Sequence, residues 1–593
     1  MRRHGDNPYR LRRVLSMKGF RVDCTTLRTW RLGVKSPAHR DSLAILGCLE
    51  ARWRLPAGYF RSKLPRTGRA TKGHDLPGLP GSERRRIAWH LPDDFDDRPR
   101  EERDEIVAWV RRVIVSGATD YRRYQAAALK QPFAVRFPGL HLVGDGVKET
   151  IPDGGRAGNV RAPAQLAAEM AELIEFKTAT LTRLGYRRSG VWGKVTALQK
   201  VKHLGLMFGA LVASPAGPVS GRGIPLSSLS SALLVLPSVW DWYLRWREQR
   251  RGFYTAWETD MLANAAALTH PETGWLTQTP GLVSRLGPVP GLATEEEVLN
   301  VGEDWKAACG RLYEFALARG VELRRATRVH RDPFEAVLAV LEAESPVAEY
   351  RKIADEILRL APCARRYPKA AAEAARSYLM IRLGLHLGFR EKNLRQLLIC
   401  RRGDTPTPER RLVDSACGEL RWSERDEGWE VFVPANAFKN ANSSFFGKRP
   451  FRLLLPDLGD LYAHIERYVG RHRPVLLGPR ADPGTFFVKS GKGPAGGATY
   501  NQTTFYEAWR WTIQRYGTFN PYTGRGAIPG LLPHGPHNVR DVLATHILKQ
   551  TGSYEQASYA IQDTPEMVAN HYGRFLPADK AAIAAQILNR VWE

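Results

Sequence analysis

The spacing of apolar residues along the chain predicts a mainly helical protein built of several parts. Apolar positions recur every three or four residues in three short stretches within 9–60, where glycine and proline mark the turns. The same periodicity returns over 101–115 and, more strongly, over 164–181 and 238–262. Residues 65–83, rich in glycine and proline, have the composition of a linker. The pattern therefore indicates separate helical domains joined by irregular segments.

A different pattern appears in the C-terminal third. The runs WEVFV (429–433) and FRLLLP (451–456) are rich in β-branched and aromatic residues, and 434–450 between them is rich in Asn, Ser and Gly. Two such runs around a polar segment predict a β-hairpin with a long tip. An apolar helix is expected next, over 501–517. We therefore expect a mainly α, multidomain chain that ends in an α+β domain with a small antiparallel sheet.

The charge of the chain points to a polyanionic partner. Its 593 residues are 43% hydrophobic and 25% charged, as in ordinary globular proteins. Lys and Arg, however, number 88 against 61 acidic residues, a net charge of +27. Such an excess favours nucleic acid, although a generally basic proteome would also produce it.

The cysteines and the apolar runs exclude several other classes. The six cysteines are scattered without paired spacing, which favours neither a disulfide scaffold nor a zinc site. No apolar run is long enough to span a membrane, and the N-terminal MRRHGDNPYRLRR lacks the apolar core of a signal peptide. We therefore expect a cytoplasmic, nucleoid-associated protein without a membrane partner.

The candidate chemistry lies in 533–572. His537 and Arg540 are three positions apart, so both side chains can point to one spot from the first turn of a helix. The guanidinium group matches phosphate oxygens, and imidazole can move a proton near neutral pH. Tyr572 follows about two helices later and supplies a nucleophile.

This order of residues resembles the tyrosine recombinase (phage integrase) family. GLHLGFREKNLRQLLI (384–399) is similar to the first box of that family and makes Arg390 the first arginine of the site. The family carries a lysine on a hairpin such as the one expected here. Lys439 is the candidate, with Lys448 as the alternative.

The resemblance implies a reaction and assigns roles to residues. Tyr572 would attack a phosphodiester and leave a 3′-phosphotyrosyl link and a free 5′-hydroxyl, without metal or nucleotide cofactor. Arg390 and Arg540 would neutralise the phosphate, His537 would assist proton transfer, and Lys439 would protonate the leaving oxygen.

Three positions depart from the family pattern. Asp563 stands where His or Trp usually faces the phosphate, and two like charges about 4 Å apart repel by about 4 kcal/mol at an effective dielectric of 20. Three states of Asp563 are open: protonated, paired with a neighbour such as His571, or turned away. Asp541 follows Arg540 where many relatives have His, and Asn393 replaces an acidic residue.

Two further regions are candidates for DNA contact. VDCTTLRTWRLGVKSP (22–37) resembles the helix-turn-helix of Cro/C1-type repressors, although any three-helix bundle with exposed arginines looks similar. In 238–262 tryptophans alternate with arginines, where the resemblance implies a helical core-binding domain. The alternative is a helix that buries its Trp residues and solvates its arginines. The candidate DNA-binding residues are Thr25, Thr26, Arg28 and Arg31, and Arg245, Arg247, Arg250 and Arg251.

The first hypothesis is a site-specific recombinase, the integrase or transposase of a mobile element. It would act on double-stranded DNA as a homo-oligomer, from dimer to tetramer, with or without partner recombinases. The second is a catalytically inactive DNA-binding or regulatory subunit of the same fold, and a weaker third is an RNA-binding protein. The expected domains are 1–65 (helix-turn-helix), 66–160 (linker and helical segment), 161–330 (core-binding), 331–364 (connector) and 365–593 (catalytic).

Overall fold

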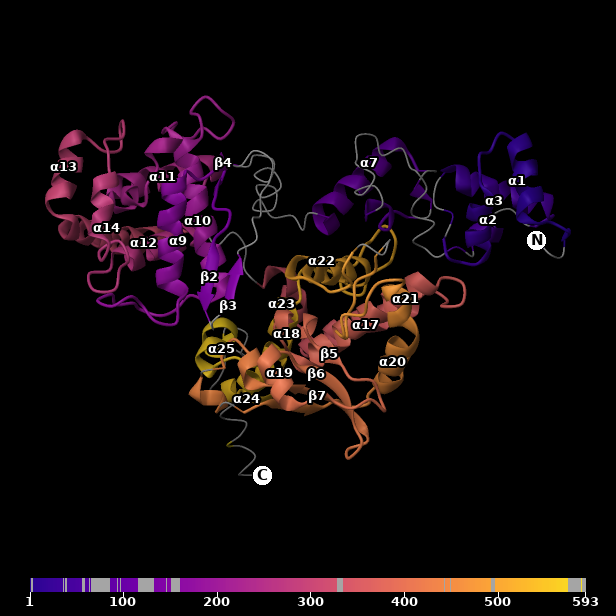
Figure 1. Cartoon of the computed structure of the whole chain (residues 1–593). Helices are drawn as coiled ribbons and strands as arrows, with labels where there is room; N and C mark the ends of the chain where they lie inside the picture. The colour runs from indigo at the N-terminus through magenta and orange to yellow at the C-terminus, as the bar shows by residue number, and fades with distance from the viewer. Residues whose placement is uncertain are drawn as a thin grey trace. The chain divides into compact units, whose positions relative to one another are not determined.

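The computed structural model is mainly helical, and the chain forms two compact units (Figure 1). One unit comprises Met1–Ala118 and Pro333–Glu593, and the other comprises Thr119–Asp332. The structure describes residues 1, 4–35, 37, 40–55, 59–62, 64, 86–92, 94–95, 98–115, 133–144, 147–150, 160–327, 334–441, 443–447, 449–491, 496–573 and 588.

The N-terminal helices follow the predicted stripes. Pro8 occupies the first turn of α1, and the Asn7 side chain accepts the Arg10 N–H at 2.8 Å. Asp23 caps α2 by accepting the Thr26 N–H. The helices bury one small core that includes Leu11. These elements are α1 (Pro8–Met17), α2 (Cys24–Arg31), α3 (Arg40–Arg52) and α4 (Tyr59–Ser62).

A segment to which sequence analysis assigned no role packs on the C-terminal part of its unit. It contains α7 (Arg100–Trp109), continued by a π-helical turn, Val110–Val115. Asn520 Nδ2 donates to the His90 carbonyl at 2.8 Å, and Gln514 Nε2 donates to the Ile114 carbonyl at 2.6 Å. These bonds from side chains to backbone fasten the segment along its length.

The C-terminal part has one core that begins before the expected boundary. The fully buried Tyr350 and Ile353 lie on α16, which packs against α17 and α23. The predicted connector 331–364 thus contributes to the core of this domain. The helices are α15 (Leu338–Leu341), α16 (Pro346–Leu360), α17 (Pro368–Leu387), α18 (Glu391–Arg395), α19 (Glu409–Ser415), α20 (Leu461–Arg467), α21 (Arg473–Leu477), α22 (Gln502–Thr512), α23 (His537–Thr551), α24 (Tyr554–Ile561) and α25 (Pro565–Tyr572).

The sheet of this part is mixed, with strand order β5-β6-β7-β8. The expected hairpin is present, because β7 pairs antiparallel with β8 and places Val431 opposite Leu453. β6 and β7 are also antiparallel, but β5 runs parallel to β6, so the expectation of a purely antiparallel sheet is corrected. The strands are β5 (Leu398–Ile399), β6 (Glu419–Ser423), β7 (Gly428–Val433) and β8 (Phe451–Leu454).

The unit Thr119–Asp332 is a helical body with two small sheets that the sequence did not predict. The single helical stretch expected over 238–262 is two helices. Gly252 ends the first with φ +82°, and Thr255 caps the second in a capping box with Glu258. The elements are β1 (Val135–Arg136), β2 (His141–Gly144), β3 (Val147–Thr150), β4 (Val160–Arg161), α9 (Ala164–Thr178), α10 (Lys194–Val212), α11 (Pro237–Arg251), α12 (Ala256–Thr269), α13 (Glu295–Glu303) and α14 (Trp305–Ala326).

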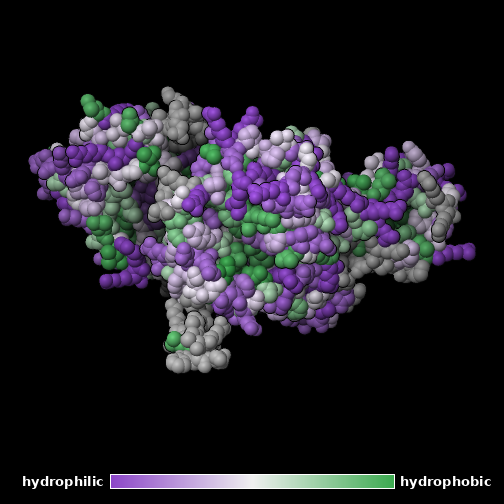
Figure 2. Space-filling view, turned by 90° about the horizontal axis from the view of Figure 1, so that it is seen from below, coloured by the Kyte–Doolittle hydropathy of each residue, from purple (hydrophilic) through white to green (hydrophobic). Residues whose placement is uncertain are grey.

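On the face in Figure 2, hydrophobic residues form scattered patches among hydrophilic ones. Within the described residues, no helix is both long and apolar enough to cross a bilayer.

Candidate active site

A turn at Gly388 brings Arg390 and Arg540, the two arginines of the candidate site, close together. Gly388 ends α17 with φ +54°, a conformation that favours glycine. A Cβ at this position would lie 2.6 Å from the Ala560 carbonyl oxygen, so α24 leaves no room for a side chain. The turn places Arg390 at the start of α18, and the Gly388 carbonyl accepts a hydrogen bond from Arg540 Nη1 at 2.7 Å. The two family-like boxes therefore meet at one point.

Arg390 and Arg540 converge on a single carboxylate oxygen. Arg390 Nη2 lies 2.7 Å from Asp563 Oδ2, and Arg540 Nη2 lies 3.0 Å from the same atom. Asn440 Nδ2 donates to the other oxygen, Asp563 Oδ1, at 2.9 Å. Of the three states left open for Asp563, the structure has a paired one, and its partners are the two arginines rather than His571.

The local backbone places Asp563 in this position. Gln562 ends α24 in the left-handed region, with φ +52°, and the Asp563 N–H donates to the Ser558 carbonyl. Arg540 is 1% exposed, and an unpaired cation at that depth would be costly. Burial lowers the pKa of Arg540 to about 10, with a smaller contribution from the charge of Arg390. Arg540 therefore stays protonated at neutral pH. Asp563 supplies the compensating charge.

Tyr572 is held next to this cluster by a residue that sequence analysis treated only as a departure. Its hydroxyl donates to Asp541 Oδ1 at 2.8 Å, and both side chains are buried. Asn538 Nδ2 donates to the other oxygen of Asp541 at 2.9 Å. Burial and the nearby Asp541 carboxylate raise the pKa of Tyr572. Because Asp541 follows Arg540 directly, the tyrosine hydroxyl contacts the neighbour of one clamp arginine.

His537 and Lys439 remain at the rim. Both residues are exposed, and His537 begins α23. Crowding by neighbouring protein, with the charges of Arg540 and Arg390, lowers the pKa of His537, so its imidazole is neutral at pH 7. Lys439 adjoins Asn440, the residue that contacts Asp563. The alternative, Lys448, lies outside the described residues.

Asn440 is the site residue that the sequence did not reveal. It lies in the predicted hairpin tip, where several asparagines were equivalent by composition. Asn393 Nδ2 donates to the Ala437 carbonyl at 3.1 Å and ties this tip to α18. The position that is acidic in the family thus serves here to hold the loop that carries Lys439 and Asn440.

The arginines predicted to contact DNA on α11 mostly face protein. Arg247 Nε lies 2.7 Å from Glu258, and Arg251 also pairs with Glu258. Arg250 donates to the Val219 carbonyl. Arg245 is exposed, although it pairs with Asp241 at 2.7 Å. The placement leaves Arg245 as the α11 arginine with a solvent-facing charge.

On α2, three of the four candidates are solvent-facing. Thr25, Arg28 and Arg31 are exposed. The hydroxyl of Thr26 instead donates to Asp23 Oδ2 at 2.7 Å and reinforces the helix cap. A helix with exposed arginines on one side is compatible with groove binding, and the contact itself stays a prediction.

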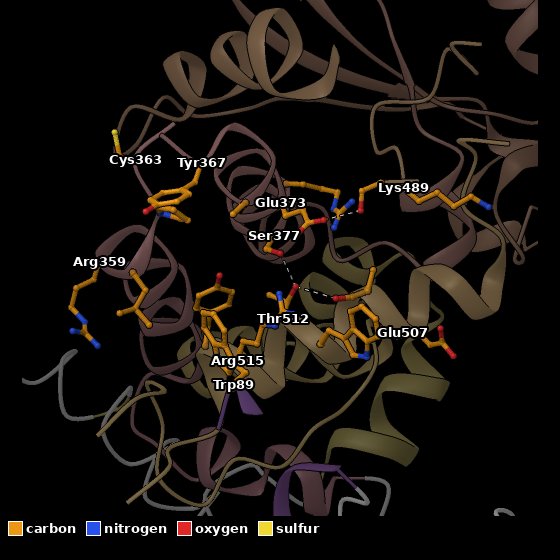
Figure 3. A pocket seen from close by; sticks show the side chains of 18 of the residues that line it. Trp89, Arg359, Cys363, Tyr367, Glu373, Ser377, Lys489, Glu507, Thr512 and Arg515 are labelled. Carbon is orange, nitrogen blue, oxygen red and sulfur yellow. Dashed lines mark hydrogen bonds between the residues drawn. The ribbon is translucent and has the colours of Figure 1, made fainter. Parts of the chain in front are cut away.

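A cavity of about 600 Å³ lies at the opposite end of α17 from Arg390 (Figure 3). Glu373, Arg376 and Ser377 line it from α17, and the Thr512 hydroxyl donates to Ser377 across its floor at 2.9 Å. Arg515 extends over the Trp89 ring, 5.1 Å from its centroid. None of the candidate site residues lines this cavity.

The chain finds no match among protein-family models, curated proteins or solved structures. Within the part of the chain that the structure describes, no group of three or more His, Cys, Asp or Glu side chains is placed to hold a metal ion.

Proposed function

We propose that the chain is a DNA strand-exchange enzyme of the tyrosine recombinase type, the integrase or transposase of a mobile element. One observation carries the proposal. Two guanidinium groups and one amide converge on the two oxygens of a single anion, and the buried tyrosine hydroxyl bonds to the residue next to one of those arginines. A phosphodiester also offers two non-bridging oxygens, so the same donors suit it.

In this proposal the scissile phosphate takes the place of the Asp563 carboxylate. Arg390 and Arg540 then stabilise the charge that grows on the phosphate oxygens in the transition state. Asp563 has to turn away, because two negative charges about 4 Å apart repel by about 4 kcal/mol at an effective dielectric of 20. The ion pairs with Asp563 therefore describe a resting site whose arginines stay ordered without DNA.

The remaining steps use the buried Tyr572 and two residues at the rim. Tyr572 attacks phosphorus and forms a 3′-phosphotyrosyl bond, and Lys439 protonates the leaving 5′-oxygen. His537, neutral at pH 7, donates a hydrogen bond to a phosphate oxygen. The new bond conserves the energy of the broken one, so religation to another strand needs no cofactor. Double-stranded DNA is the partner, a homo-oligomer on DNA is the working form, and the cytoplasmic nucleoid is the place.

A non-catalytic DNA-binding subunit is the second candidate. The observation that favours it is the closed site, in which Asp563 occupies both arginines and the Tyr572 hydroxyl is engaged by Asp541. Such a protein would bind the ends of its element without cutting them.

Covalent trapping separates the two. The protein is mixed with nicked duplexes cut from the ends of its own element, and the mixture is denatured in SDS. We expect a protein band that carries labelled DNA for the wild type and no such band for Tyr572→Phe. If both proteins bind the duplexes and neither yields a band, the second candidate is favoured.

A further inference from the structure

The hydroxyl of Tyr572 donates a hydrogen bond to the Asp541 carboxylate, and Asn538 in turn donates to that carboxylate. Asp541 Oδ1 accepts the tyrosine O–H at 2.8 Å, while Asn538 Nδ2 occupies Oδ2 at 2.9 Å. Asp541 and Asn538 lie one turn apart on α23, and Tyr572 is the last residue of α25. The amide fixes the rotation of the carboxylate, so one oxygen is aimed at the hydroxyl.

Asp541 and Tyr572 are both buried in the domain. Asp541 is 4% exposed and Tyr572 is 6% exposed, and the Phe334 ring lies 5.8 Å from the ring of Tyr572. The charged or titratable groups that face Asp541 are Arg540 on its own helix, Tyr350 from α16 and Tyr572 from α25. Burial raises the pKa of Asp541 to about 6, against lowering by its hydrogen bonds and by Arg540.

We propose that Asp541 is the catalytic residue that removes the proton of Tyr572 as the tyrosine attacks, an inference that rests on the proposed recombinase function. In this step the tyrosine O–H bond breaks and its proton moves to Asp541 Oδ1, while the tyrosine oxygen forms a bond to phosphorus. The bond from phosphorus to the 5′-oxygen breaks, and the leaving oxygen takes a proton from Lys439. On religation the protons return along the same route.

The positions of the two candidate bases, His537 and Asp541, agree with separate roles for them. His537 and Asp541 are four residues apart on α23, so both project from one face of that helix. The tyrosine hydroxyl donates to Asp541 rather than to His537. His537 is therefore free to hold a phosphate oxygen. The carboxylate is ionised at neutral pH, and its raised pKa brings its proton affinity closer to that of the hydroxyl.

Asp541→Asn tests the inference, because it keeps the shape and an oxygen acceptor but removes the base. We expect its rate of covalent complex formation on nicked duplexes to fall by about 100-fold or more, the usual contribution of a general base. Binding of the same duplexes, measured by gel shift, should not change. A wild-type rate that drops below pH about 6 and a variant rate that is flat over the same range would report the carboxylate directly.

A duplex with sulfur in place of the scissile 5′-oxygen distinguishes acid from base. The thiolate leaves without a proton, so this substrate should restore Lys439→Ala but not Asp541→Asn. Rescue of Asp541→Asn by sulfur, or a variant rate equal to wild type on both substrates, would overturn the role of Asp541. A wild-type protein that forms no covalent complex on either substrate would instead overturn the proposed function itself.

Discussion

Two buried arginines of the same unit carry their charge in different ways. Arg540 is 1% exposed and shares the Asp563 carboxylate with Arg390. Arg376, in the cavity wall, is 9% exposed, donates to the Val488 carbonyl, and lies 5.8 Å from the centroid of the Tyr500 ring. Among the described residues no carboxylate lies within ion-pair distance of Arg376.

The two arginines therefore differ in role: Arg540 belongs to the candidate site, and Arg376 holds two parts of the fold together. A carbonyl and an aromatic face are fixed parts of the fold, so Arg376 ties the irregular segment at Val488 to α17. A single aspartate shared by two arginines is a small anion that another anion can replace. In the proposed function, the charge of Arg540 is therefore available to a phosphate, and that of Arg376 is not.

Replacing each arginine by methionine should give the largest contrast. Arg540→Met removes a donor that stabilises the transition state, so covalent complex formation on nicked duplexes should fall by about 1,000-fold or more. Arg376→Met, the matched control, should keep the wild-type rate within a few-fold. Its melting temperature should fall, because the buried Val488 carbonyl loses its donor. Equal losses in both variants would remove the distinction between the two arginines.

Asp563→Asn should expose the anion site. The variant leaves the buried Arg540 and the partly buried Arg390 uncompensated, and we expect a loss of about 4 kcal/mol in a buffer without polyvalent anions. Sulfate should restore much of its melting temperature. The matched control is Asp482→Asn, which strips the buried Arg473 of its carboxylate away from the site, and which sulfate should not restore. Identical responses to sulfate would contradict the idea of an exchangeable anion.

Under the proposed function, Asp563→His should keep or raise covalent complex formation, because it removes the carboxylate that would compete with a phosphate. Trapping on nicked duplexes measures it. A large loss would mean that the carboxylate itself is needed during cleavage.

Asp541→Asn should stabilise the fold in a pH-dependent way. The folded-state pKa of Asp541 is raised from 3.8 to about 6, so the stabilising contribution of this group is present below pH 4 and is lost as the pH rises through 6. The variant escapes that loss and should be more stable than wild type at pH 7.5 by up to about 3 kcal/mol. Melting temperatures from pH 4 to 8 should diverge with rising pH. A difference in melting temperature between variant and wild type that does not change with pH would show that ionisation of Asp541 does not destabilise the fold.

Arg28→Ala removes an exposed arginine and should have the smallest effect of these substitutions on DNA binding and stability. Its guanidinium lies on the solvent side of α2, so it can contribute one phosphate contact at most. We expect the slope of log binding constant against log salt to become shallower by about 0.9, with the melting temperature unchanged. An unchanged slope would remove Arg28 from the interface.

The residues that were predictable were those with a chemically distinctive type and order. Arg390, Arg540 and Tyr572 stand in an order that pointed to one site, and the structure brings both arginines to one carboxylate. The helical character of the chain was also predictable from apolar periodicity, and the β7–β8 hairpin from two runs of β-branched and aromatic residues around a polar segment.

The pairings across the fold were not predictable. The state of Asp563 depends on the left-handed turn at Gln562, and the contact of Asn440 depends on the course of a long loop. The bond from Tyr572 to Asp541 joins α25 to α23 across the intervening helix α24, and the residue spacing alone does not show it. Arg247 and Arg251 looked like a surface stripe because their partner, Glu258, lies on the next helix, beyond the turn at Gly252.

The most direct test of the account is the identity of the residue that becomes bonded to DNA. The trapped complex is digested with nuclease and protease, and the peptide that retains a nucleotide is sequenced by mass spectrometry. We predict a nucleotide joined through its 3′-phosphate to Tyr572. Attachment at another residue, or through a 5′-phosphate, would contradict the assignment of Tyr572 as nucleophile and of Arg390 and Arg540 as its phosphate clamp.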